Sequence, residues 1–179
     1  MKIEVEIEGI RPLLQNRFPE EGYEAASRTK KQVGVHPKDD PKQKLYMLTD
    51  GTVYQPAEHL LRSMTKAAVN YKIGGRGRKT YKDIILSSVF ITPEAIPHKI
   101  QKWVTDERSV VIKATRGRII RRRPKFEKWN LAFTLDVQEE QIDAETIKRI
   151  LDYAGQYVGI GDYRPRFGLF MVTRFEEIE

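Results

Sequence analysis

The 179-residue chain contains no cysteine, no long apolar run and only three histidines. Without cysteine there is neither a disulfide framework nor a thiolate metal site. No apolar run reaches the roughly 18 residues of a membrane helix, and the first residues lack the basic-then-apolar pattern of a signal peptide. We therefore expect a cytoplasmic protein. His36, His59 and His98 show no metal-binding spacing, so neither a metal nor another cofactor is expected.

What the chain does have is basic charge concentrated in two segments. Residues 113–128 contain eight Lys and Arg and one Glu, and residues 59–82 contain seven Lys and Arg and no acid. Each segment carries +7, which equals the net charge of the whole chain, so the remaining residues carry −7. Charge segregated in this way creates a local field, and its commonest partner is a polyphosphate chain.

Hydrophobic periodicity predicts a single α+β domain over residues 1–179. Four segments have the apolar pattern of strands: residues 2–10, 84–91, 129–137 and 169–175. The last is apolar on both faces, which is typical of a central strand. Amphipathic helices are predicted at residues 57–71 and after Asp143, a candidate N-cap. The order β-α-β-β-α-β predicts a ferredoxin-like, RRM-like fold with an antiparallel sheet and two helices.

Two excursions interrupt this order. Residues 19–44 are rich in proline and charge and are predicted to be a polar insertion, followed by a hairpin that turns at Asp50 and Gly51. Residues 113–128 are predicted to form a basic arm, a protruding hairpin with apolar and aromatic residues among its arginines. Such an arm can follow phosphates and stack on a base. The alternative is a charged edge strand that prevents edge-to-edge pairing.

Two glycine-rich segments are further candidates for nucleic-acid contact. Residues 74–79 form a basic loop next to the first helix, without the pattern of a phosphate-binding P-loop. Residues 159–168, Gly-Ile-Gly-Asp-Tyr-Arg-Pro-Arg-Phe-Gly, precede the last strand. Glycines allow close backbone approach, the arginines can bind phosphate, and Tyr163 can stack on a base. The alternative is a tight connection whose glycines merely end the helix.

The second of these segments, placed before the last strand, resembles the RAMP superfamily, the RNA-binding ferredoxin-like proteins of CRISPR effector complexes in antiviral defence. The segment from Val53 to Met64 is similar to the strand-to-helix junction of that superfamily, where a proline, here Pro56, begins the first helix. The resemblance implies that the basic arm takes the place of the protruding hairpin of backbone subunits. It also implies a catalytic alternative, because some members are metal-independent ribonucleases that use a histidine; His59 is the candidate here.

We therefore expect a non-catalytic protein that binds the phosphate backbone of single-stranded nucleic acid, RNA in preference to DNA. It would self-associate, the acidic part of one copy meeting the basic arm of the next, or join other subunits of a ribonucleoprotein complex. The alternatives are an endoribonuclease using His59, a phage-type protein that binds or anneals single-stranded DNA, and a subunit whose arm binds an acidic protein. Trp129 is either a stacking residue or part of the core. The residues predicted to contact nucleic acid are Arg62, Lys66, Arg76, Arg78, Lys79, Arg118, Arg121, Arg122, Arg123, Lys125, Phe126, Tyr163, Arg164 and Arg166.

Overall fold

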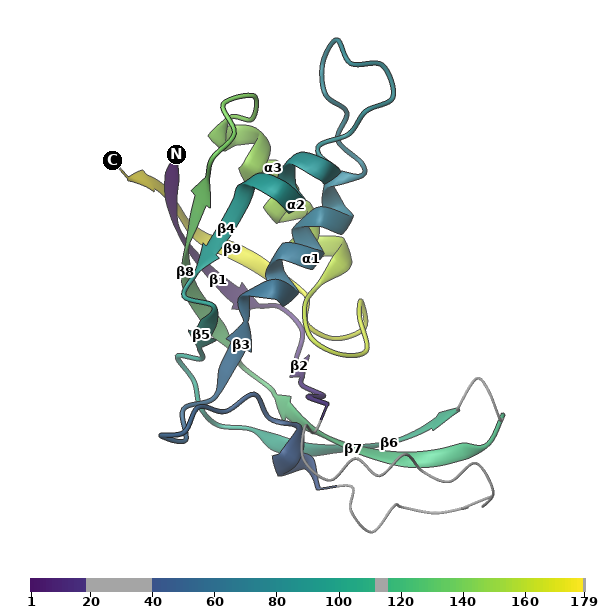
Figure 1. Cartoon of the computed structure of the whole chain (residues 1–179). Helices are drawn as coiled ribbons and strands as arrows, with labels where there is room; N and C mark the ends of the chain where they lie inside the picture. Colours follow the sequence, from purple (N-terminus) through teal and green to yellow (C-terminus); the bar gives the residue numbers. More distant parts are fainter. Residues whose placement is uncertain (19–39, 112–115, 179) are drawn as a thin grey trace.

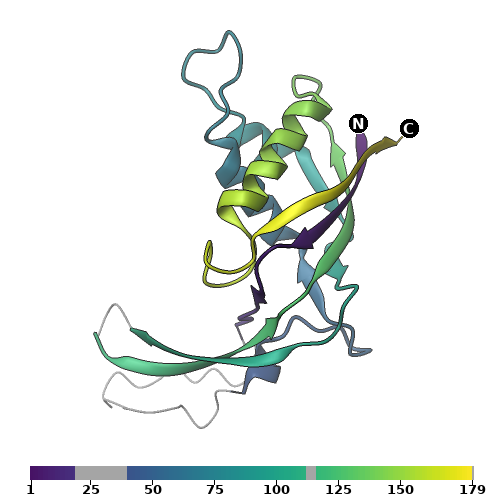
Figure 2. The same cartoon turned by 180° about the vertical axis from the view of Figure 1, so that it is seen from behind.

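The computed structural model describes residues 1–18, 40–111 and 116–178. Its largest sheet has four antiparallel strands in the order β4-β8-β1-β9 (Figure 1). The strands are β1 (Lys2–Gly9), β4 (Val89–Thr92), β8 (Asn130–Val137) and β9 (Phe170–Ile178). The helices α1 (Ala57–Ala68), α2 (Lys82–Ser88) and α3 (Ala144–Tyr153) lie on one side of this sheet (Figures 1 and 2). The protein is therefore α+β, as predicted.

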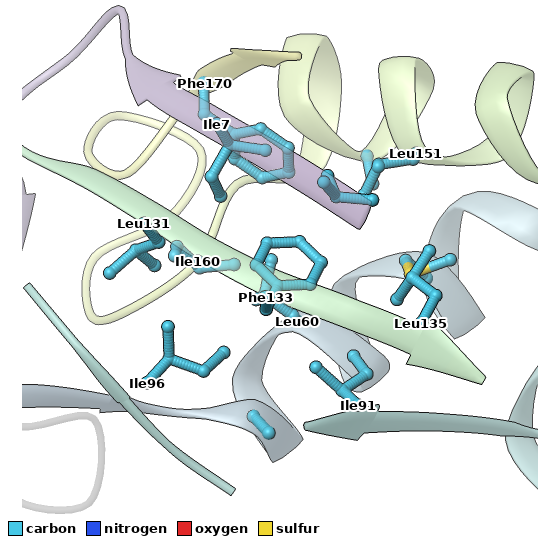
Figure 3. Close-up of a cluster of buried hydrophobic side chains, with 14 of the residues drawn as sticks. Ile7, Leu60, Ile91, Ile96, Leu131, Phe133, Leu135, Leu151, Ile160 and Phe170 are labelled. Atoms are coloured by element: carbon cyan, nitrogen blue, oxygen red, sulfur yellow. The ribbon is translucent and has the colours of Figure 1, made fainter. Parts of the chain in front are cut away.

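Strict alternation along the two central strands decides which face the helices cover. On β1, Ile3, Val5 and Ile7 are buried, and the glutamates between them lie on the opposite face. β8 follows the same alternation. Leu60 of α1 and Leu151 of α3 meet this apolar face (Figure 3). Because each fully buried side chain of this size contributes about 1.5–3 kcal/mol, the alternation places the helices on one face and leaves the other open.

The helix boundaries follow local signals in the sequence. α3 begins at the predicted N-cap, where the Asp143 carboxylate accepts a hydrogen bond from the Thr146 amide at 2.7 Å. Ile142 and Ile147 are both buried beside this cap, as a hydrophobic staple requires. A π-helical turn, η2 (Ala154–Val158), extends α3 toward the glycine-rich segment. Of the described residues, no helix is both long and apolar enough to cross a bilayer.

Two smaller sheets project from the end of the molecule opposite the chain termini. β2 (Leu13–Leu14), β7 (Arg118–Phe126) and β6 (Val104–Val111) pair in the order β2-β7-β6, and β3 (Tyr54–Pro56) pairs with β5 (Ala95–Pro97). β6 and β7 form a long antiparallel hairpin, which protrudes at the lower right of Figure 1. We call this hairpin the arm. The sequence predicted its second half; the first half, β6, was not assigned to it.

Two expectations about secondary structure are wrong. The apolar run at residues 84–91 was predicted to be a strand, but α2 occupies most of it and only the end forms β4. A short apolar run fits either structure, and here Ile85 packs into the core from a helix that lies against α1. The last strand, β9, is an edge strand and not a central one, so Met171 is 50% exposed.

The predicted excursion before α1 is seen only in part. Residues 19–39 of the polar insertion lie outside the described residues, and the 3-10 helix η1 (Pro41–Lys44) follows them. The predicted hairpin turns at Gly51, where φ is +89°, but its strands meet at a single bridge between Met47 and Val53. Tyr54 donates its amide across this hairpin to the Tyr46 carbonyl at 2.9 Å, and Tyr54–Pro56 pairs with β5.

Candidate nucleic-acid interface

Residues 159–168, the glycine loop, are held rigidly between η2 and β9. The Asp162 amide donates to the Leu14 carbonyl and the Gly168 amide to the Pro12 carbonyl, both at 2.8 Å. A Cβ at Gly168, where φ is +76°, would lie 1.8 Å from the Ile160 carbonyl oxygen. Ile160 itself points into the core (Figure 3). The glycines therefore serve tight packing, as the structural alternative proposed, and that packing presents residues 162–166 at the surface.

Tyr163 occupies the exposed tip of this loop in an uncommon backbone conformation. Its φ is +58°, which non-glycine residues adopt in only a few per cent of cases. Strain of this kind persists only where the surroundings enforce it, and it is concentrated at functional sites. The ring is 48% exposed and lies 5.9 Å from the ring of Phe167. The loop thus holds an aromatic ring at the surface, next to the neighbouring arginines, in a backbone conformation that costs free energy.

A buried arginine connects the arm to the glycine loop. Arg123 of β7 is 5% exposed, and its Nη1 lies 3.2 Å from the Asp162 carboxylate. Its guanidinium also lies 5.6 Å from the centre of the Tyr163 ring. Its Nε and Nη1 have no hydrogen-bond acceptor among the described residues. Since buried donors are normally satisfied, Arg123 is a charged group with spare hydrogen-bonding capacity directly beneath the loop.

The three consecutive arginines of the arm do not form one surface. Successive strand residues point to opposite faces, so Arg121 and Arg123 share the face toward the glycine loop, and Arg122 lies on the other. Arg122 pairs with Glu107 at 2.9 Å there, and its carbonyl accepts a hydrogen bond from Lys44 of η1. Arg118 lies on the same far face as Arg122 and is exposed.

Arg108 of β6, which the sequence did not single out, lies on the loop side of the arm. It is paired across the hairpin with Arg121, and its guanidinium lies 4.6 Å from the centre of the Phe167 ring. A 2.7 Å hydrogen bond to the Asp106 carboxylate raises the pKa of Arg108 above its ordinary value. No local pattern identifies this residue, because its partner Phe167 is distant in sequence. Arg108 could be identified from its position opposite Arg121, and recognising that position requires the register of the two strands.

Helix α1 supplies the third side of the interface. Lys66 is exposed and lines a cavity of about 330 Å³ together with Tyr157, Tyr163 and Arg164. Arg62, one turn earlier, pairs with Glu58 at 2.5 Å, but both side chains are about two-thirds exposed. An exposed pair of this kind contributes at most about 1 kcal/mol, so Arg62 can leave it for a phosphate.

His59 lies on the first turn of α1, where it faces β3 and Tyr46. Its Nδ1 accepts a hydrogen bond from the side-chain amide of Gln55 at 2.5 Å, and the ring of Tyr46 packs edge-on at 5.3 Å. Burial, reinforced by the positive charge of Arg164, lowers the pKa of His59 to about 4. The imidazole is therefore neutral near pH 7, with its proton on Nε2.

Several predicted residues lie elsewhere. Arg76, Arg78 and Lys79 are exposed on the loop between α1 and α2, at the end of the molecule opposite the arm (Figure 1). Phe126 is fully buried and stacks on His98 at 4.5 Å, so it cannot stack on a base as predicted. Trp129 is 1% exposed and belongs to the core, the second of its two expected roles.

Of the remaining two predicted residues, one is exposed at the surface and the other forms an ion pair. Arg166 is exposed on the glycine loop, beside Pro165 and Arg164. Lys125 of β7 pairs with Glu127 at 2.6 Å near the base of the arm. The predicted site thus reduces to Arg62 and Lys66 on α1, Tyr163, Arg164 and Arg166 on the loop, and Arg121 on the arm. Arg123 was predicted to contact nucleic acid, but it is buried beneath the loop and supports it instead.

The open face of the four-stranded sheet has the opposite character. Strand register places Glu4, Glu6 and Glu8 of β1 there, with Asp136 of β8 and Glu176 of β9 beside them. Carboxylates outnumber the basic side chains on this face, where Arg174 bridges Glu4 and Glu176. The open-face positions of β1 and β8, all of them described, carry no aromatic ring. RNA-recognition modules stack bases on aromatics at these strands, so this face is unsuited to that mode of binding.

Comparison with known proteins adds no assignment. No protein-family model matches the chain, and no curated protein is significantly similar to it. Within the described residues, no group of three or more His, Asp or Glu is close enough to hold a metal ion.

Proposed function

We propose that this protein binds single-stranded nucleic acid, RNA in preference to DNA, on the side of the molecule formed by α1, the glycine loop and the arm. The observation that carries the proposal is the convergence of basic side chains from three distant segments around an exposed tyrosine. Lys66 and Arg164 line one cavity with Tyr163, and Arg123, on the same face of the arm as Arg121, lies 5.6 Å from the centre of the Tyr163 ring. Phosphates pair with the cations and a base stacks on the ring.

The distribution of charge supports this side over the open face of the sheet. A polyphosphate strand is repelled by the glutamates of β1 and attracted to the arginines of the loop and the arm. Asp162, the acid closest to Tyr163 in sequence, is paired with the buried Arg123. Because most of these contacts are to phosphate, we expect low sequence specificity and a strong dependence on salt.

We propose further that the four-stranded sheet with α1 and α3 is a ferredoxin-like core. In support, the strands follow in chain order as β1, β4, β8 and β9, with α1 before β4 and α3 before β9. The sheet order β4-β8-β1-β9 is compatible with two interlocked β-α-β units. Together with the glycine loop and the protruding arm, this supports membership of the RAMP superfamily, and it is the basis for preferring RNA. A repeating subunit of a CRISPR-type ribonucleoprotein complex is the corresponding cellular role.

The environment of His59 does not favour the endoribonuclease alternative. A general acid or base works best when its pKa lies near the working pH, whereas burial lowers that of His59 to about 4. The hydrogen bond from Gln55 fixes the ring against β3. We infer that His59 positions the start of α1 against β3 and Tyr46. If the wild-type protein cleaves RNA and the His59→Ala variant does not, this inference is wrong.

The proposal is tested by fluorescence anisotropy with single-stranded RNA, single-stranded DNA and duplex DNA over a series of salt concentrations. We expect single strands to bind more tightly than the duplex, with log Kd rising linearly with log salt. Arg121→Ala should reduce the salt slope by about 0.7, the value for one phosphate contact of a single strand. Arg118→Ala, on the far face of the same strand, is the matched control and should change it less.

Either of two results would count against this proposal. If no nucleic acid binds at low salt, the interface has another partner, and the acidic-protein alternative becomes the leading one. If Arg118→Ala and Arg121→Ala weaken binding equally, the strand does not discriminate between the faces of the arm, and the site is misplaced.

A further inference from the structure

Three tyrosines form a continuous row across the helical layer, which begins at the cavity of the interface described above. The rings of Tyr71 and Tyr153 lie 6.0 Å apart, and those of Tyr153 and Tyr157 lie 4.7 Å apart. Tyr71 follows α1, Tyr153 ends α3 and Tyr157 belongs to η2. Single exposed aromatics are ordinary, but rings in sequence at this spacing match the stacking platforms of single-strand-binding proteins.

The row connects two cavities. Tyr157 at one end lines the 330 Å³ cavity that contains Lys66 and the glycine loop. Tyr71 at the other end lines a cavity of about 510 Å³, together with Lys72, Tyr81 and Arg149. Both volumes lie in the range of small-ligand sites, which is large enough for a nucleobase. Each cavity therefore combines an aromatic wall with a basic side chain.

The outer ring of the row is more exposed than packing alone requires. Tyr71 and Tyr153 are partly buried against the core, but Tyr157 is 60% exposed. It lies in a π-helical turn, a feature that occurs frequently at functional sites. The turn brings Gly155 so close to β9 that a Cβ there would lie 2.3 Å from the Phe170 carbonyl oxygen. A close helix-to-strand contact thus supports the turn that holds Tyr157 at the surface.

The cations along the row are placed to accompany a strand. The Arg149 guanidinium lies 5.6 Å from the centre of the Tyr71 ring, and the Tyr71 hydroxyl donates to the Arg149 carbonyl at 3.0 Å. Lys72 is exposed beside them and leads into the basic loop that carries Arg76 and Arg78. That loop stands at the top of Figure 1 and the arm at the bottom, with the helices between.

We propose that the bound strand continues from the glycine loop along Tyr157, Tyr153 and Tyr71 to the cavity at Lys72 and Arg149. This extension rests on the proposed function and adds to it a base-stacking segment on the helical layer. It gives a role to the basic loop at residues 74–79, which is otherwise remote from the interface. A strand that follows this path engages both +7 segments of the sequence at once.

The test compares Tyr157→Ala with Phe90→Ala, which removes a ring of similar exposure, 51%, from the open face of the sheet. Binding of oligouridylates of about 4 and about 12 nucleotides, within the range known for single-strand sites, is followed by fluorescence anisotropy. With the longer strand, Tyr157→Ala should raise Kd about tenfold without changing the salt slope, because stacking releases no counterion. With the shorter strand the increase should be smaller, and Phe90→Ala should leave both affinities unchanged.

Two further variants keep the result interpretable. Tyr157→Leu retains apolar bulk without an aromatic ring. If Tyr157→Ala lowers the melting temperature, Tyr157→Leu serves in its place and should raise Kd by the same factor. Lys72→Ala should reduce the salt slope for the longer strand by about 0.7. Equal affinities of Tyr157→Leu, Phe90→Ala and wild type for the longer strand would overturn the extension while leaving the proposed function standing. A wild-type protein that binds neither strand would overturn both.

Discussion

Replacing Asp162 by asparagine should lower stability and raise affinity at the same time. The carboxylate neutralises Arg123, whose side chain is 6% exposed, at an Nη1–Oδ2 distance of 3.2 Å. At an effective dielectric constant of about 20, two charges at this distance attract by roughly 5 kcal/mol, and desolvation cancels part of this energy. Because the Asp162 side chain is 35% exposed, water can partly replace the carboxylate beside Arg123 in the variant. We expect a loss of about 2 kcal/mol in the free energy of unfolding.

That loss corresponds to a fall in melting temperature of about 4–8 °C for a domain of this size. The same substitution removes a negative charge from the proposed phosphate path. A charge about 7 Å from a phosphate in water contributes about 0.6 kcal/mol, so single-stranded RNA should bind about threefold more tightly. Urea denaturation and fluorescence anisotropy measure the two effects on one preparation.

Glu107→Gln is the control, because it removes the same charge from an exposed pair on the far face of the arm. There we expect a change in stability of about 0.2–1 kcal/mol and a smaller change in affinity. If Asp162→Asn leaves stability unchanged, Arg123 does not depend on this carboxylate. If it weakens RNA binding, the acid is part of the binding site and our placement of the strand is wrong.

Three further predictions concern the scaffold of the site. Gly168→Ala should destabilise the protein by more than about 3 kcal/mol in urea denaturation, because its Cβ would lie 1.8 Å from a carbonyl oxygen at a φ of +76°; a change below 1 kcal/mol would show that the loop can move aside. Asp143→Ala should cost about 1 kcal/mol by the same measurement, since it removes the N-cap of α3, and an unchanged stability would show that the cap is dispensable. His59 and His98 are kept neutral by burial, with pKa values lowered from 6.5 to about 4, so the unfolded chain binds more protons and stability should fall as the pH decreases from about 6.5 to about 4. A His98→Gln variant should lose part of that dependence, and an identical pH profile would contradict it.

Most of the secondary structure was predictable because it depends on local patterns. The alternation on β1 and β8 and the apolar stripe of α1 show within a few residues which face is buried. Asp143 likewise marks the start of α3 as its N-cap. The run at residues 84–91 was assigned incorrectly because three consecutive apolar residues fit a helix as well as a strand. The edge position of β9 depends on which strands pair with β1. The sequence of β9 alone does not indicate this pairing.

The candidate site was predicted in composition but not in geometry. The sequence identified the basic arm and the glycine loop, yet it could not separate Arg121 and Arg123 from Arg122, because that division depends on strand register. Phe126 appeared among arginines and was taken for a stacking residue, although it fills the core beneath β7. Tyr157 was overlooked because the helical stripe was counted only for aliphatic residues, although its ring partner Tyr153 lies four residues earlier.

The most direct test of the central claim is to locate the bound strand on the protein. Single-stranded RNA containing 4-thiouridine is crosslinked by light to the wild-type protein, and the modified peptides are identified by mass spectrometry. The account predicts crosslinks in α1, in η2 and the glycine loop, and on the loop-facing side of β7. Crosslinks concentrated on the open-face residues of β1, β8 and β9 would contradict it.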